Sequence, residues 1–138
     1  MSQIASLYIV KTADLLAGRF TSAAVEKIDY KWSGYTFIIL SAYSEEIGLD
    51  WDKLEHHDLS IALSEKTGTW ITLFSIHDKQ SVLSELNPAV LSLDELENFA
   101  LAFSGDKGFG NAIFDAVKIL NASLNQIDDE SVVLLEVT

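Results

Sequence analysis

Apolar and β-branched residues concentrate in three short segments, and each segment predicts a β-strand. The first segment is Ile4 to Val10, the second is Thr69 to Ile76, and the third is Val132 to Val137. Dense β-forming residues with no internal glycine or proline favour extended structure in segments of this length. The pattern therefore predicts about three strands, one near each end of the chain and one in the middle.

Between these strands, apolar residues recur at helical spacing, beside residues that commonly begin or end helices. The predicted helices cover residues 12–16, 23–28, 35–47, 57–65, 78–86, 93–103 and 111–126. The segment 35–47 is ambiguous, because Thr36 to Leu40 has the composition of a strand. We interpret it as a helix because Ser33 can cap its start and Ile47-Gly48-Leu49 is typical of a helix end.

The start signals and inward faces of the later helices can also be predicted. Asp78 is expected to cap one helix, the Ser92 to Glu95 capping box to open the next, and Asn111 to cap the longest. The residues expected to face the interior are Leu59, Ala62 and Leu63 in the segment 57–65, and Leu93, Leu96, Phe99, Ala100 and Phe103 in the segment 93–103. Strands separated by helices indicate a single α+β domain over residues 1–138, with a small sheet packed against several helices.

The net charge of the chain limits the kinds of partner that it can bind. The chain has 9 basic and 21 acidic residues, for a net charge of −12. Residues 1–32 are near neutral, with four bases and three acids, so about −13 arises after Trp32. This excess repels polyanions and attracts cationic partners, which argues against nucleic-acid binding. The N-terminal residues lack the pattern of a signal peptide and no apolar run could cross a bilayer, so we expect a cytoplasmic protein with no membrane contact.

Candidate catalytic and metal-binding residues are few. There is no cysteine, which excludes disulfides, thiolate metal sites and a cysteine nucleophile. The three histidines, His56, His57 and His77, lack the i, i+4 spacing of helical metal ligands. The Gly105 to Gly110 segment departs from the phosphate-loop pattern, and no Gly-x-Ser-x-Gly motif is present. We therefore predict no metal, no cofactor and no enzyme activity.

An acidic stretch in the middle of the chain is the strongest candidate for a binding site. Six acids surround one tryptophan, and we predict that these seven residues bind a partner: Glu45, Glu46, Asp50, Trp51, Asp52, Glu55 and Asp58. Charge would steer the encounter with a basic protein surface, and the ring of Trp51 would supply an apolar anchor. The alternative is that Trp51 belongs to the core and the acids only keep the domain soluble.

Two passages resemble small bacterial proteins of the YfbM-like kind. They are the opening Met1-Ser-Gln-Ile-Ala-Ser-Leu-Tyr8, and Trp32-Ser-Gly-Tyr35 followed by an apolar helix and Ile47-Gly-Leu-Asp50. The resemblance covers about a third of the chain and assigns no functional residue. Small acidic bacterial proteins of this type resemble immunity proteins, which implies binding and neutralisation of a cognate toxin.

Three functional hypotheses remain open at this stage. The first is a bacterial immunity protein that occludes the basic cleft of a toxin domain. The second is a small-ligand-binding protein or an enzyme that uses His56, His57 or His77 with nearby carboxylates. It requires a concave pocket where at least one histidine meets a carboxylate and a second polar group. The third is a homo-oligomeric structural protein, with edge strands or the apolar stripe at Phe99 and Phe103 as its interface.

Overall fold

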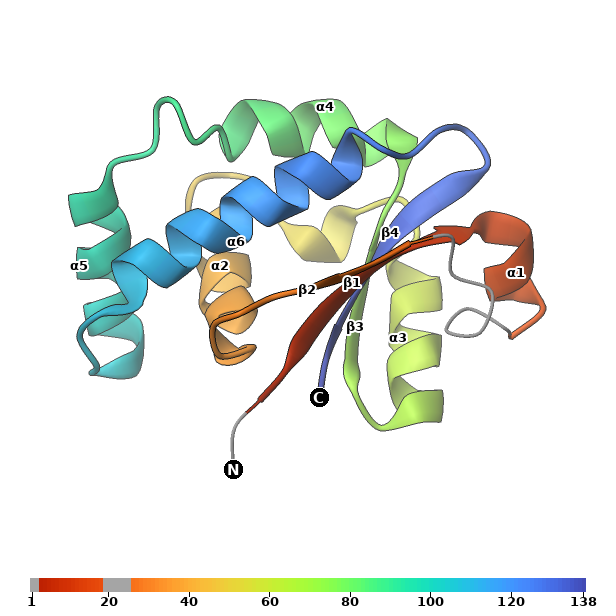
Figure 1. The fold of residues 1–138 in the computed structure, drawn as a ribbon, viewed down its shortest axis with the longest axis horizontal. Coiled ribbons are helices and arrows are strands. Elements are labelled where there is room, and N and C mark those ends of the chain that lie inside the picture. Colours follow the sequence, from red (N-terminus) through yellow and green to blue (C-terminus); the bar gives the residue numbers. More distant parts are fainter. Residues whose placement is uncertain (1–2, 19–25) are drawn as a thin grey trace.

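A four-stranded antiparallel sheet organises the computed structural model, which describes residues 3–18 and 26–138. The strands lie in the order β2-β1-β4-β3 (Figure 1). Their bounds are β1 Ala5–Lys11, β2 Glu26–Asp29, β3 Trp70–Phe74 and β4 Ser131–Val137. The longest pairing joins β1 to β4, from Ala5 opposite Val137 to Lys11 opposite Ser131, so both ends of the described chain meet in the sheet centre.

Helices cover both faces of this sheet (Figure 1). The helices are α1 Thr12–Leu16, α2 Tyr35–Glu46, α3 His57–Thr67, α4 Ile76–Glu85, α5 Leu93–Ser104 and α6 Phe109–Leu124, with a 3₁₀ turn η1 at Trp51–Lys53. The larger core joins one sheet face to α2, α4, α5, α6 and η1. A smaller core joins the other face to α1 and α3.

Burial on two sides explains the composition of the central strands. Alternate residues of β4 enter different cores, so Val133 and Leu135 join the larger one while Val132 and Leu134 join the smaller one. A strand with one face in water would alternate apolar and polar residues instead. The near-continuous apolar runs in β1 and β4 therefore follow from the layered architecture.

The outer edge of β3 is covered by serines of α3. The Ser64 hydroxyl accepts a hydrogen bond from the Ile71 backbone N–H at 2.9 Å, and the Ser60 hydroxyl accepts one from Leu73 N–H at 3.0 Å. Exposed strand edges invite pairing with other chains. The two serines satisfy the edge donors within the domain and fix α3 beside β3.

The α+β class is confirmed, and the sheet has one strand more than the three expected. The additional strand is β2, where a helix over 23–28 was predicted; residues 23–25 lie outside the described part, and the remainder is extended. Ile28 pairs with Leu7 and Glu26 with Ile9. The hydrogen bonds that β1 offers outweigh the weak helical propensity of so short a segment.

The predicted helix over 35–47 is confirmed, and Gly48 adopts the left-handed conformation that the helix end requires. Three predicted helix starts are wrong. The N-cap of α2 is Gly34 rather than Ser33, and the N-cap of α6 is Gly108 rather than Asn111. The N-cap of α4 is Ser75, and Asp78 completes its capping box from the third helical position.

Candidate functional site

A groove between α2 and α5 includes one of the predicted binding residues, Glu46. We call it the α2–α5 groove; its volume is about 640 Å³, and it is lined by Tyr43, Glu46, Ile47, Glu95, Asn98, Phe99, Ala102 and Phe103. Its apolar wall is made by stacked rings, since the centroids of Phe99 and Phe103 lie 6.0 Å apart. Phe103 remains 45% exposed. Such a surface leaves apolar area available for a partner.

The sequence predicted that all five apolar residues of the α5 stripe face the interior, and this prediction is wrong for part of the stripe. Leu96 and Ala100 are fully buried, while Leu93 and Phe103 are about half exposed. In Figure 1, α5 lies at one end of the molecule, beside α6. The predicted inward position of Ala62 on α3 is also wrong, because that residue is exposed. No sequence signal distinguished the covered from the uncovered part of the α5 stripe.

The electrostatics of the α2–α5 groove are uniformly negative. Neither α2 nor α5 contains a lysine or arginine. Burial raises the pKa of the Tyr43 hydroxyl above its usual value, and the carboxylates of Glu95 and Glu46 raise that pKa further. These two acids from different helices therefore lie near the same hydroxyl, at the margin of an apolar groove.

The structure distributes the acidic stretch over three settings. Glu45 and Glu46 are exposed at the end of α2, with Glu46 in the α2–α5 groove. The Asp50 carboxylate accepts a hydrogen bond from the Asp52 backbone N–H at 2.9 Å and so caps η1. Glu55 and Asp58 lie just before and within the first turn of α3. The acids therefore do not all surround one point.

Trp51 is in the core, which contradicts its predicted role as an exposed anchor. Its side chain is only 4% exposed, and its ring stacks on Trp70 at 6.1 Å and meets Phe74 edge to face at 5.1 Å. Its buried indole N–H finds no hydrogen-bond partner within residues 3–18 and 26–138. The sequence alternative, in which Trp51 belongs to the core, is the correct one for this residue.

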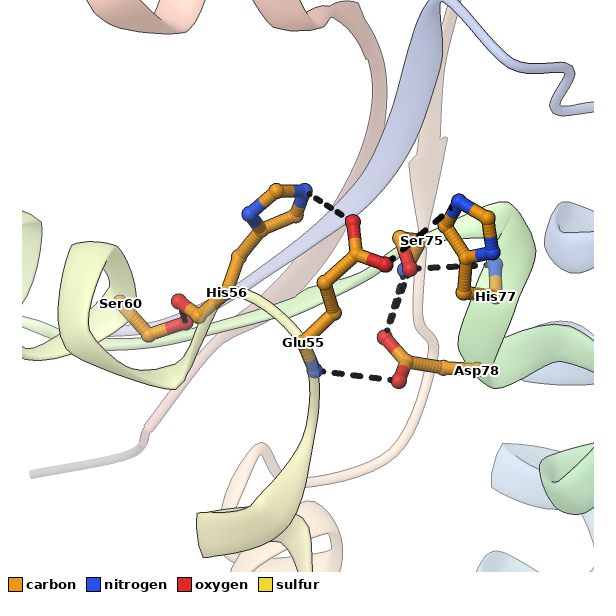
Figure 2. Close-up of polar contacts among 6 residues, drawn as sticks. All are labelled: Glu55, His56, Ser60, Ser75, His77 and Asp78. Atoms are coloured by element: carbon orange, nitrogen blue, oxygen red, sulfur yellow. Dashed lines mark hydrogen bonds and ion pairs between the residues drawn. The ribbon is translucent and has the colours of Figure 1, made fainter.

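The histidines do not scatter, because each faces a carboxylate. Figure 2 shows the Glu55 carboxylate between two imidazoles, with His56 Nε2 at 3.0 Å and His77 Nε2 at 3.6 Å. The third imidazole, of His57, lies 3.8 Å from Asp52. These contacts place Glu55 and Asp52 beside groups that offset part of their charge when protonated.

The serine, histidine and aspartate at the start of α4 do not have the geometry of a catalytic triad. The Ser75 hydroxyl donates to Asp78 at 3.0 Å and accepts the backbone N–H of His77, so both groups serve the capping box (Figure 2). The His77 imidazole faces Glu55 rather than Ser75. In the described part of the chain, no three acidic or histidine side chains converge as a metal site would require.

A second concavity lies beside the outer edge of β3, and we call it the edge pocket. Its volume is about 230 Å³, and its walls come from η1, α3 and β3, with Ser41 of α2. Trp51 and Asp52 belong to η1, His57 and Glu65 to α3, and Trp70 and Thr72 to β3. Here a histidine, His57, does meet a carboxylate in a concave site, as the small-ligand hypothesis requires. Sequence reasoning missed Glu65, Trp70 and Thr72, which no motif distinguishes.

No model of a protein family, no curated protein and no solved structure matches this chain. The likeness to YfbM-like proteins therefore stays an expectation from two short passages. None of the helices in residues 3–18 and 26–138 is long and apolar enough to cross a membrane.

Proposed function

We propose that this protein binds a basic protein partner through the α2–α5 groove and the acidic stretch that follows it. The observation that supports this best is the combination within the groove of exposed aromatic surface with two carboxylates, Glu46 and Glu95. Apolar contact supplies affinity in such interfaces, while charge complementarity selects the partner and speeds association. The occupant is an amphipathic, lysine- or arginine-bearing segment of the partner, lying along the groove with its apolar face on Phe99 and Phe103.

The charge distribution favours a different protein over a second copy of this chain. In a symmetric dimer the same surface meets itself, so the acids of the α2–α5 groove would be brought close to their own copies. Like charges at an interface cost several kcal/mol, and the net charge of −12 adds a general repulsion. A basic partner removes both costs.

The partner class that we propose is a toxin domain with a cationic cleft, which would make this protein its immunity protein. Toxins that act on nucleic acids need basic clefts to hold phosphates, and an acidic protein that covers such a cleft blocks substrate entry. Inhibition of the purified toxin by an equimolar amount of this protein would support the assignment. A basic partner whose activity is unaffected would overturn the toxin class while leaving the interaction intact.

The groove itself can be tested without the natural partner. The probe is a synthetic amphipathic helical peptide of leucine and lysine, titrated into ¹⁵N-labelled protein, with a glutamate-for-lysine peptide as its charge control. We expect the amide shifts to concentrate on α2 and α5 for the lysine peptide, to weaken with salt, and to be absent for the glutamate peptide.

Two pairs of substitutions distinguish the contribution of the groove carboxylates from that of the general negative charge of the surface. Glu46→Gln with Glu95→Gln should weaken peptide binding about tenfold, as expected for the loss of two charge-assisted contacts. The matched pair Asp129→Asn with Glu130→Gln removes the same charge from the exposed turn before β4 and should change affinity far less. Equal effects of the two pairs, or shifts spread evenly over the surface, would refute the groove as the binding site.

A further inference from the structure

We propose that a pocket beside α6, which we call the α6 pocket, binds a small planar aromatic carboxylate. The pocket lies where residues 29–32, at and after the end of β2, face α6, and its volume is about 390 Å³. That volume is within the range of about 300–1,000 Å³ that is typical of small-molecule sites. The α6 pocket shares no lining residue with the α2–α5 groove or the edge pocket, so this inference is independent of the proposed protein partner.

The aromatic walls of the α6 pocket are fixed to the fold by contacts that are independent of any ligand. The indole N–H of Trp32 donates a hydrogen bond to the Asp115 carboxylate on α6 at 2.8 Å. The hydroxyl of Tyr30 donates to the Ala112 carbonyl of α6, and the Tyr30 ring meets Phe37 edge to face at 4.9 Å. A site whose side chains are already ordered loses less conformational entropy when a ligand binds.

Trp32 provides an aromatic surface that the fold leaves open to a ligand. It remains 46% exposed, although its N–H is held by α6. Ile119 and Ala122 of α6 add apolar area to the same pocket. Aromatic rings stack on one another with a gain beyond the area that they bury. A planar aromatic ring is therefore the apolar part of the ligand that fits these walls.

The local charge of the α6 pocket differs from that of the rest of the surface, because the acids that line it have basic partners. Asp29 pairs with Lys27 at 3.6 Å, and Asp115 pairs with Lys118 at the same distance. Lys31 also lines the pocket, and its ammonium group has no ion-pair or hydrogen-bond partner among the described residues. Salt screens exposed charges beyond about 8 Å at physiological ionic strength, so the more distant acids have little influence here.

This balance of charge selects a ligand with one negative charge. A single carboxylate supplies the counter-ion that the Lys31 ammonium group lacks. A phosphate dianion would bring a further negative charge toward Asp29 and Asp115, and a cation would be repelled by Lys31. A neutral aromatic compound would leave Lys31 unpaired and should bind more weakly than the carboxylate.

The test uses naphthalene-2-carboxylate as the probe. Naphthalene-2-carboxamide is its neutral analogue of nearly the same shape, and cyclohexanecarboxylate is an anion without an aromatic ring. The chain has three tryptophans, whose indole N–H signals in ¹H–¹⁵N spectra report the location of binding. We expect the probe to shift the signal of Trp32, and the signals of Trp51 and Trp70, which line the edge pocket, to stay fixed. Each of the two analogues should bind about fivefold more weakly than the probe.

Substitutions then assign the two parts of the ligand to their residues. Lys31→Gln should weaken binding of the carboxylate about threefold to fivefold and leave binding of the carboxamide unchanged. The control Lys53→Gln removes the same charge from an exposed position in η1 and should change neither affinity. Trp32→Leu should weaken binding of both naphthalene compounds, measured from the backbone amide shifts of α6.

Three results would each overturn the proposal. They are equal binding of the carboxylate and the carboxamide, equal effects of the two lysine substitutions, and a Trp32 signal that moves no more than those of Trp51 and Trp70. None of these results depends on the protein partner, so the proposed function is tested separately by its own peptide titration.

Discussion

Two buried serines allow a matched test of how the edge of β3 is held. Ser60 on α3 and Ser44 on α2 are 4% and 0% exposed, and each donates its hydroxyl to the backbone carbonyl four residues earlier. Only Ser60 also accepts a strand donor, the backbone N–H of Leu73, at 3.0 Å in a buried position. Replacing either serine by alanine therefore removes the hydrogen bond to a helical carbonyl. Replacing Ser60 also removes the acceptor of the Leu73 N–H.

The two substitutions are therefore expected to lower the free energy of unfolding by different amounts. The carbonyls that lose a serine hydroxyl lie within helical turns, so the loss of that bond costs at most about 1 kcal/mol. Ser60→Ala also leaves the Leu73 N–H buried without an acceptor, at a cost of about 1–3 kcal/mol. The gain in helical propensity on changing serine to alanine is similar in both helices and cancels in the comparison. Ser60→Ala should therefore be less stable than Ser44→Ala by about 1–3 kcal/mol.

Urea unfolding gives the two free energies of unfolding, and thermal melting should separate the variants by about 4 °C for each kcal/mol. Amide hydrogen exchange supplies the local readout, because Leu73 should lose protection in Ser60→Ala but not in Ser44→Ala. Equal destabilisation by the two substitutions, with Leu73 equally protected in both, would refute the assignment of Ser60 as the acceptor for the strand edge.

Two further predictions concern the close approach of the Gly34 and Ile4 backbones and the pH dependence of stability. Gly34→Ala should destabilise the fold by about 1–3 kcal/mol in urea unfolding, because the new Cβ would lie 2.9 Å from the Ile4 backbone, which is hydrogen-bonded to Thr138. An unchanged midpoint would contradict this. The Glu97 carboxylate accepts backbone N–H bonds from Gly108 and Gly110, which lower the pKa of Glu97. A pKa below that of the unfolded chain means that the carboxylate stabilises the fold above the ordinary carboxyl range and loses this effect as pH falls through the folded pKa. Glu97→Gln should therefore be less stable than wild type at neutral pH and equal to it in acid, whereas a difference that persists in acid would rule out this linkage.

Element types could be predicted where local signals agreed. The helix over 35–47 followed from its end signal at Gly48 despite the strand-like Thr36 to Leu40, because a left-handed glycine with an apolar residue after it belongs to helix ends. The strand β2 could not be predicted, because its stability depends on pairing with β1, about twenty residues earlier. Tertiary hydrogen bonding of this kind leaves no local signature.

The candidate site could be predicted in charge but not in shape. Acids around Trp51 are compatible with either an exposed anchor or a core residue, and the choice depends on Trp70 and Phe74, which lie far along the chain and pack against it. Phe103 shares the apolar stripe of α5 with buried residues, yet it stays about half exposed, although the Tyr35 ring of α2 lies 6.4 Å from its own ring. Both outcomes depend on how elements pack, which periodicity alone does not contain.

The groove and the edge pocket are close enough to serve one partner. Glu46 lines the groove and Asp52 lines the pocket, and the two residues are six positions apart in the chain. Six residues span at most about 22 Å when fully extended. A standard interface buries about 800 Å² on each partner, which corresponds to a patch about 30 Å across. One domain seated on the groove is therefore wide enough to reach the edge pocket as well.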